Sequence, residues 1–255
     1  PGPVRLERRP FQDHALSMAS FLRGEVDVLF TGTTLGASQR AKGVQLWRTV
    51  VWGSASILIR TEPSAGDALE QLAGKKGALP FAGSPNDIQM QRLSRKSKIR
   101  WQSVYQPHLQ SVASLLAGQI HATVAPEPLA SRLVAEGKAY RLAGLSDLEK
   151  KILPTEEAPA PLVSFFVKSD LSPAKRKALT LLDQKLKQAL QQLKDDSGAL
   201  AEKYAESYQV SAPVLSEGLK HTYFDLPETS LSHQRTRAFL QAAGLENPDD
   251  SFFLP

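Results

Sequence analysis

Two stretches of the chain repeat one local pattern at a fixed distance of 94 residues. Residues 19–43 read ASFLRGEVDVLFTGTTLGASQRAKG, and residues 113–137 read ASLLAGQIHATVAPEPLASRLVAEG, aligned without a gap. Both run from a helix end through a glycine and a short apolar strand to a loop and a second helix. A chain that contains this unit twice is predicted to form two similar α/β lobes.

Each part of the repeated unit has a physical interpretation. In the first copy an apolar stripe at helical spacing follows Asp13, which is a candidate N-cap. Gly24 and its counterpart Gly118 follow the stripes, where a helix C-terminus favours a residue with positive φ. The apolar runs at 26–30 and 120–124 are typical of strands covered on both faces. Ligands bind at the carboxyl ends of such strands, so the two following loops are candidate binding elements.

The segments between and after the two copies alternate between strand and helix patterns. The long helix that opens at Ser172-Pro173 carries leucines along one face, and the tail after Tyr208 has a less regular pattern. The predicted elements are a long strand at 47–61, a short helix at 67–72, a strand at 75–81, a helix at 88–97, a helix at 128–135 and a strand at 162–168.

Composition excludes several chemistries. The chain has no cysteine, so disulfides, thiolate metal sites and cysteine nucleophiles are impossible. Its 31 basic and 26 acidic residues give a mild excess of +5. The basic cluster lacks the interleaved aromatics of single-strand nucleic-acid binders, which favours a solvated helix end over a nucleic-acid partner. The five histidines are scattered, so we expect no metal, no cofactor and no catalytic residue. The basic cluster comprises Arg92, Arg95, Lys96, Lys98 and Arg100.

The order of five segments resembles a known family. They read LRGEVDVLFTG, GSASILIR, ALEQLAGKKGALPFAGSP, SLLAGQIHATVAPEPLASRL and LVSFFVKSDL. In this order they resemble the solute-binding proteins of ABC importers of the nitrate, sulfonate, taurine and thiamine-precursor class. The resemblance implies a type II periplasmic-binding fold, in which two α/β lobes are joined by two crossover segments. Lobe one would comprise residues 1–61 and 162–255, and lobe two residues 62–161, with crossovers near 59–64 and 158–164.

One feature departs from the family pattern. Members of the family begin with a further strand and helix, whereas Val4 to Arg8 here already resembles the second strand. We therefore expect the fold without its first βα unit. That unit is either lost, absent from this chain, or replaced in a divergent member, and its ligand contacts cannot be assigned.

The resemblance also implies a function. Such proteins capture a small-molecule solute outside the cytoplasm and deliver it to a membrane permease without catalysing a reaction. We expect a monomer in the periplasm or at the cell surface, with the signal sequence not present in this chain. The solute is a small organic molecule, a nitrogen heterocycle, or an oxyanion such as a sulfonate.

The strand-end loops supply the main candidate ligand contacts. The first repeat strand ends in hydroxyls and a glycine, and a similar polar turn precedes the helix at 88–97. Backbone N–H groups at a helix start bind polar or anionic ligand heads, although the same residues also serve as ordinary caps. The two loops are expected to face each other across a cleft. The candidate residues are Thr31, Gly32, Thr33, Thr34, Ser84, Pro85, Asn86 and Asp87.

Two further positions are candidate contacts. Pro126-Glu127-Pro128 ends the second repeat strand and resembles the acid–proline loop of the family. The Glu127 carboxylate would bind an amine or a ring N–H, or would cap the following helix. Trp52, Gly53 and Ser54 lie near the first crossover, where an aromatic wall is common, although a core tryptophan fits the pattern equally well.

Two other functions remain open on the same fold. One is a small-molecule lyase or dehydratase, and the other is the effector domain of a LysR-type transcription regulator. About ninety residues follow the return strand at 162–168, which is longer than expected for an effector domain. An upstream helix-turn-helix would favour the regulator, and an upstream secretion signal would favour the importer.

Overall fold

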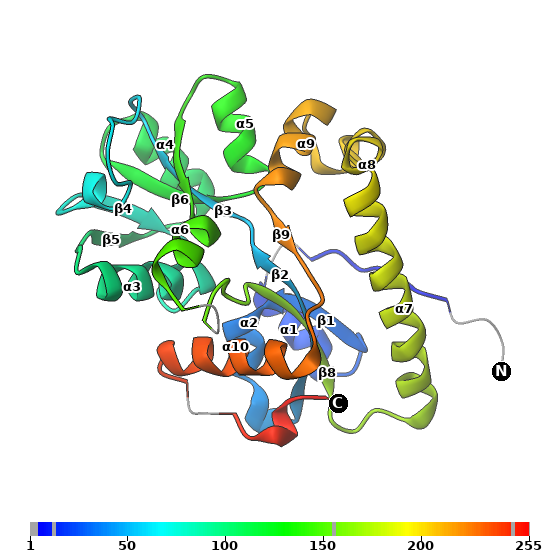
Figure 1. Cartoon of the computed structure of the whole chain (residues 1–255). Coiled ribbons are helices and arrows are strands. Elements are labelled where there is room, and N and C mark those ends of the chain that lie inside the picture. Colours follow the sequence, from blue (N-terminus) through cyan, green and yellow to red (C-terminus); the bar gives the residue numbers. More distant parts are fainter. Residues whose placement is uncertain (1–4, 12–13, 155–156, 246–247, 255) are drawn as a thin grey trace.

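The computed structural model describes residues 5–11, 14–154, 157–245 and 248–254. It contains two β-sheets, each flanked by helices (Figure 1). The first sheet has the order β1-β8-β2-β9, with all neighbours antiparallel, and its strands are β1 (Val28–Gly32), β8 (Val163–Lys168), β2 (Val44–Gly53) and β9 (Tyr223–Phe224).

The second sheet has the order β5-β4-β6-β3-β7. β4 is parallel to β5 and β6, whereas β3 is antiparallel to β6 and β7. The two sheets confirm the predicted two-lobed α/β fold. The strands are β5 (Gln102–Tyr105), β4 (Lys76–Leu79), β6 (Ala122–Pro126), β3 (Ala55–Ile59) and β7 (Tyr140–Gly144).

The repeat is present in the structure at the same 94-residue offset. Helix α1 (His14–Leu22) corresponds residue for residue to α4 (His108–Leu116), and β1 corresponds to β6. Gly24 and Gly118 both end their helices, with φ of 79° and 71°. The backbone N–H after each glycine reaches back to the equivalent carbonyl at 3.0 and 2.9 Å, which is a glycine C-cap. Both strands begin two residues later than predicted, and the candidate N-cap Asp13 lies outside the described residues.

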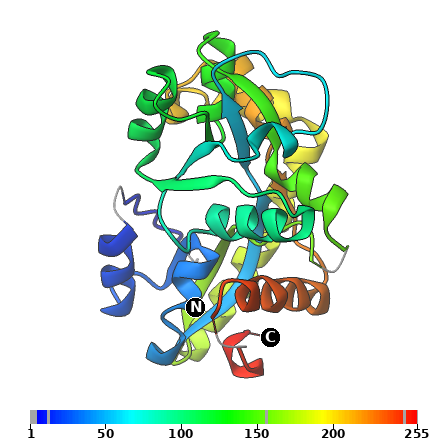
Figure 2. The same ribbon diagram turned by 90° about the vertical axis from the view of Figure 1, so that its left-hand side faces the viewer.

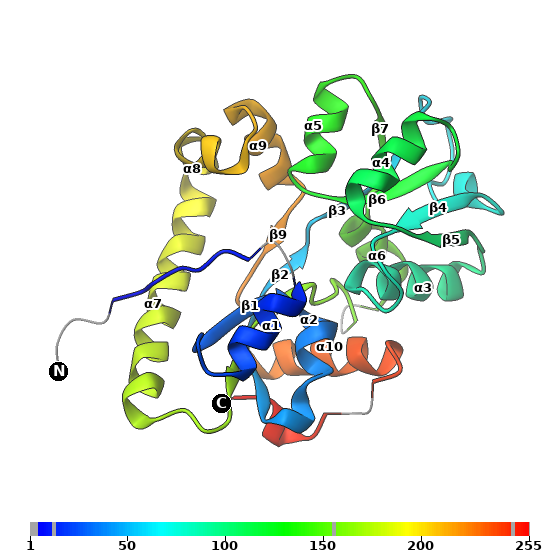
Figure 3. The same ribbon diagram turned by 180° about the vertical axis from the view of Figure 1, so that it is seen from behind.

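The remaining helices cover the two sheets (Figures 2 and 3). The long helix α7 runs along one side of the molecule and leads to α8 and α9, and α9 packs against α5. These helices are α2 (Thr33–Ala37), α3 (Pro85–Ser97), α5 (Leu129–Ala135), α6 (Leu145–Ile152), α7 (Pro173–Asp195), α8 (Ser197–Tyr204), α9 (Ala212–Lys220) and α10 (Thr229–Ala242).

The tail after Tyr208 is more ordered than its sequence pattern indicated. It forms α9, β9 and α10, because β9 pairs with β2 and because Phe239 and Leu240 of α10 are fully buried. These partners are distant in the sequence, so the local pattern carries little sign of them. The predicted helix at 67–72 is reduced to a 3₁₀ turn, Glu70–Leu72.

The first crossover lies earlier than predicted. The single long strand expected at 47–61 is divided at Ser54 into β2, which belongs to the first sheet, and β3, which belongs to the second. The predicted end of lobe one at residue 61 is therefore wrong for residues 55–59, which belong to the second sheet. Ser146 occupies the space beside Gly53, where an added Cβ would lie 1.5 Å from the serine hydroxyl oxygen. The remaining lobe boundaries stay predictions.

The first sheet lacks counterparts of two strands of the second. The repeat and the pairing relate β1 to β6, β8 to β3 and β2 to β7, which leaves β4 and β5 unmatched among the described residues. Residues 8–11 precede β5 by the same 94 positions, but β5 is hydrogen-bonded only to β4. Among the described residues no counterpart of β4 is present for residues 5–11 to pair with, and they form no strand. The strand expected at Val4 to Arg8 is therefore not formed over 5–8, and Val4 itself lies outside the described residues.

A buried ionic network connects α3, α6 and the returning segment. The Glu149 carboxylate, fully buried on α6, accepts hydrogen bonds from Gln89 (2.9 Å), the Ala160 N–H (2.9 Å) and Arg92 (3.3 Å). Arg92 is 4% exposed and also contacts Glu157 at 3.0 Å. Arg92, which was expected with the rest of the basic cluster at a solvated helix end, is thus buried in an ion pair. Its guanidinium lies over the ring of Phe239.

Helix α3 also packs against the first sheet's side of the molecule. It lies directly beside α10 (Figure 2), and an apolar cluster joins the two sides. The contact between the two sides of the molecule is therefore apolar at this point, in addition to the polar network described above. The cluster comprises Val51, Ile88, Ala160, Leu162 and Phe239.

We expect the stability contributed by Glu149 to fall as pH rises. Burial raises the pKa of this carboxyl above its ordinary value of 4.5, and the nearby Arg92 charge only partly opposes that shift. The folded state therefore binds a proton at Glu149 more tightly than the unfolded chain does. The stability that this difference contributes is complete below pH 4.5 and is lost as pH rises through the raised pKa. Glu149→Gln cannot titrate, so its melting temperature relative to the wild type should increase from acid to neutral pH. Glu157→Gln is the control, because that carboxylate also contacts Arg92 but is 43% exposed. Equal pH profiles for the two variants would contradict the assignment.

The repeated glycine caps should contribute equally. Gly24→Ala and Gly118→Ala place a side chain at positive φ, where an added Cβ meets nothing closer than 3.6 Å. The cost is therefore backbone strain of about 1 kcal/mol each, or a fall in melting temperature of about 2–4 °C. Gly198→Ala in helix α8 is the control and should be neutral or stabilising. A loss of stability in only one of the two variants would show that the two caps do not contribute equally.

Candidate functional site

The two loops predicted to face each other are in direct contact. The Thr34 hydroxyl, at the start of α2, donates a hydrogen bond to the Gly83 carbonyl at 3.1 Å. A Cβ at Gly32 would lie 3.5 Å from Pro85, which begins α3. The junction of β1 and α2, called the first loop below, therefore meets the loop between β4 and α3 of the second sheet.

The hydroxyls of the first loop have different roles. Thr33 is fully buried, and its hydroxyl lies 2.8 Å from that of Ser164, which in turn lies 2.9 Å from Thr49. The Thr33 N–H also donates to the Leu162 carbonyl, so Thr33 holds the first sheet together. Thr31 is only 3% exposed, and its hydroxyl has no hydrogen-bond partner among the described residues. A buried hydroxyl without a partner is costly, and a ligand would remove that cost.

The second loop carries a buried carboxylate. Ser84 caps α3 by accepting from the Asp87 N–H at 3.2 Å, and Asp87 accepts from the Gly83 N–H at 2.8 Å. The Tyr105 hydroxyl donates to Asp87 at 3.2 Å, and burial, together with the Asp87 charge, raises the pKa of Tyr105. The Asp87 carboxylate thus supplies the negative charge that is favourable at the positive end of the α3 helix dipole. Asn86 is half-buried, and within the described part of the chain its amide has no hydrogen bond.

Glu127 is held in a separate network. Its side chain is 2% exposed and pairs with Arg141 at 2.8 Å. It also accepts from Ser56 at 3.2 Å and from the Ser131 N–H at 3.0 Å, and it packs against Gly218 of α9. The carboxylate predicted to contact a ligand is therefore already fully hydrogen-bonded, on the side of β6 that faces α9.

Trp52, Gly53 and Ser54 lie at the first crossover. Trp52 is fully buried, and its indole N–H donates to the Asp225 carbonyl at 3.1 Å. The Ser54 carbonyl accepts from the Glu127 N–H at 2.7 Å. The structure thus gives Trp52 the core position that the sequence left open, and the backbone here joins the two sheets.

Sequence reasoning missed two residues at the loop contact. Gly83 provides the carbonyl that accepts from Thr34, and Tyr105 provides the hydroxyl that contacts Asp87. Tyr105 ends β5, which is parallel to β4, so the rule that ligands bind at the carboxyl ends of parallel strands would have found it. Among the described residues, no group of three or more His, Asp or Glu side chains is placed to hold a metal ion. In the same part of the chain, no helix is both long and apolar enough to span a bilayer.

Several solved structures share this arrangement. A protein from Parabacteroides distasonis described as an ABC transporter superposes with a TM-score of 0.74 at 15% identity, covering 96% of this chain and 86% of its own. The periplasmic aliphatic sulphonate-binding protein of Escherichia coli gives 0.66 at 18% identity, covering 89% and 74%. A Candida albicans gene product described as having the generic periplasmic binding protein fold gives 0.62 at 15% identity, covering 93% and 80%. The chain therefore has the periplasmic-binding-protein fold. Comparison with models of known protein families and with curated proteins finds no match.

We expect Thr33 to act through stability. Thr33→Ala removes a buried hydroxyl from the chain that includes Ser164 and Thr49, which should cost about 1–2 kcal/mol of unfolding free energy. Thr33→Ser keeps the hydroxyl and should retain more of that stability. Urea denaturation of both variants measures the difference. Identical losses in the two variants would show that the methyl group, not the hydroxyl, matters.

Proposed function

We propose that the protein is the extracytoplasmic solute-binding component of an ABC importer, which captures a small molecule between its two sheets and catalyses no reaction. Its partners would be the solute and a membrane permease, and we expect it to act as a monomer. The observation that carries the proposal is the buried Thr31 hydroxyl, which has no hydrogen-bond partner among the described residues. Thr31 lies near the carboxyl end of β1, just before the segment whose Thr34 contacts the second sheet. The half-buried amide of Asn86 lies in the first turn of α3, on the other side of this contact.

The fold of the comparison structures supports this proposal. Structures described as periplasmic sulphonate-binding proteins and as an ABC transporter share the two-sheet arrangement. In such folds a hinge between two lobes allows closure on a ligand.

The chemistry of the loops limits the solute. Asp87 keeps a buried negative charge at the start of α3, so an oxyanion there would be repelled. The available groups are a hydroxyl and an amide, which hydrogen-bond neutral or cationic polar groups equally well. We therefore propose a small organic molecule with a neutral or basic polar head, and place Glu127 in a supporting role through Arg141.

A ligand screen with matched variants tests the site. A true solute present at 100 times its dissociation constant should stabilise the protein by about 2.7 kcal/mol. Thr31→Val removes an unpaired hydroxyl, so it should preserve apo stability but weaken binding about tenfold, and Asn86→Ala should do the same. Thr123→Val is the control, because Thr123 is also buried and its hydroxyl also lacks a partner among the described residues, but it lies at the second position of β6, away from that strand's carboxyl end. Tight binding of sulfonates, or equal losses in the control, would contradict the proposed site.

A further inference from the structure

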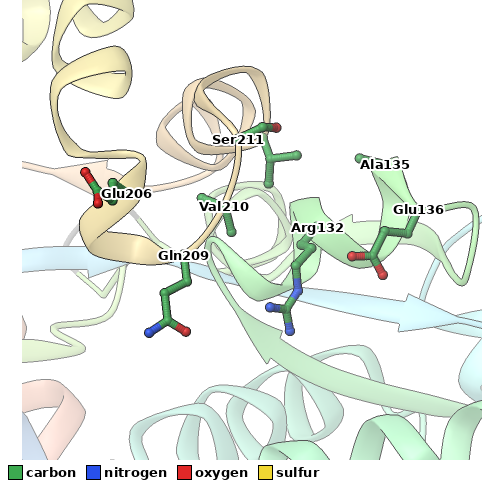
Figure 4. Close-up of a pocket in the computed structure, with 8 residues that line it drawn as sticks. Arg132, Ala135, Glu136, Glu206, Gln209, Val210 and Ser211 are labelled. Carbon is green, nitrogen blue, oxygen red and sulfur yellow. The ribbon is translucent and has the colours of Figure 1, made fainter.

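A pocket lies away from the loop contact, between α5 and the segment that leads into α9 (Figure 4). Its volume is about 580 Å³, within the range of about 300–1,000 Å³ typical of small-molecule sites. One wall comes from the second sheet's helix α5, and the other from the 3₁₀ turn Glu206–Tyr208 and the start of α9. A ligand here would touch two parts of the chain more than seventy residues apart.

Arg132 is the cation of this pocket. It lies on α5, is half-buried, and has neither an ion pair nor a side-chain hydrogen bond within the described part of the chain. A guanidinium stays charged at every physiological pH and offers a planar set of donors that fits a carboxylate in two-point contact. Apart from the nearby charge of Glu136, no described group neutralises Arg132, so its guanidinium donors are open to an anionic group supplied from outside.

Gln209 lines the other wall of the pocket, and its backbone is strained. Its φ is 54°, and Gln209 and Lys98 are the non-glycine residues at positive φ among those described. Glycine would adopt this conformation without the steric cost that a Cβ brings. Strained residues of this kind cluster at ligand sites, and the Gln209 amide lines the pocket. In Figure 4 the Arg132 and Gln209 side chains extend in the same direction from the two walls.

The pocket also offers an anionic group and an apolar surface. Glu136, one turn after Arg132, pairs with Lys138 at 2.7 Å, and that hydrogen bond together with nearby positive charge lowers the pKa of Glu136. Its carboxylate is therefore ionised at neutral pH. Figure 4 shows Glu136 on the opposite side of Arg132 from Gln209. Val210 and Val214 provide the apolar lining between the walls.

We propose that this pocket binds a small zwitterion of the amino-acid type. The ligand carboxylate contacts Arg132 and the Gln209 amide, its ammonium lies toward Glu136, and an apolar side chain packs on Val210 and Val214. The site is separate from the loop contact at Thr31 and Asn86, so it holds whether or not that contact binds a transported solute.

Titration of the full chain with three probes tests the charge pattern. L-leucine carries both charges, L-leucinamide lacks the carboxylate, and 4-methylpentanoate lacks the ammonium. We expect saturable binding of L-leucine by calorimetry and at least tenfold weaker binding of each analogue. Arg132→Gln should weaken L-leucine at least tenfold while leaving L-leucinamide unchanged. No saturation at millimolar concentrations, or equal binding of all three probes, would overturn the proposal.

Two glycine variants separate a binding role from a structural one. Gln209→Gly relieves the backbone strain, so the melting temperature of the apo protein should hold or rise while L-leucine binding falls. Lys98→Gly relieves the same strain at the end of α3, away from the pocket, and should leave binding unchanged. Thr31→Val should also leave L-leucine binding unchanged, which distinguishes this pocket from the loop contact. If Gln209→Gly keeps full L-leucine affinity, or Thr31→Val abolishes it, the assignment of the pocket fails.

Discussion

The strand β8 is the element on which the first sheet depends. It lies between β1 and β2 and is hydrogen-bonded to both, although more than a hundred residues separate it from them in the chain. Leu162, just before β8, donates to the Val51 carbonyl and accepts from the Thr33 N–H. These bonds fix the returning crossover against the same loop that contacts α3. The first sheet therefore closes only after the chain has passed through the second, and its closure positions the candidate site.

The repeat made the architecture predictable, because its signals are local. A glycine after an apolar helix and an apolar run before a loop predict a capped helix and a strand from residues close in sequence. Partners distant in sequence account for the failures. β3 was assigned to the first lobe because nothing within 47–61 shows that residues 55–59 pair with β6. The strand expected near residue 8 does not form over 5–8, where the described residues offer it no pairing partner.

The candidate site was predictable in position but not in detail. The rule that ligands bind at strand carboxyl ends located both loops, and the structure brings them into contact through Thr34 and Gly83. The same rule could not tell that Thr33 turns into the sheet whereas the Thr31 hydroxyl stays unpaired, because the partner of Thr33, Ser164, lies 131 residues away in the chain. The roles of Trp52 and Glu127 likewise depend on partners that lie distant in the sequence or on a different element.

The two repeated loops show how one scaffold acquires different surfaces. By the 94-residue offset, Thr31 to Thr34 correspond to Ala125 to Pro128, so a hydroxyl in one copy stands where a carboxylate stands in the other. The first loop meets α3, and the second meets α9, a helix without a counterpart in the repeat. Because α9 and its preceding turn occupy the side of β6 that would otherwise mirror the first loop, the carboxylate there is buried against protein. The two copies are thus asymmetric: the first carries the unpaired Thr31 hydroxyl, and beside the second lies the pocket lined by Arg132 and Gln209.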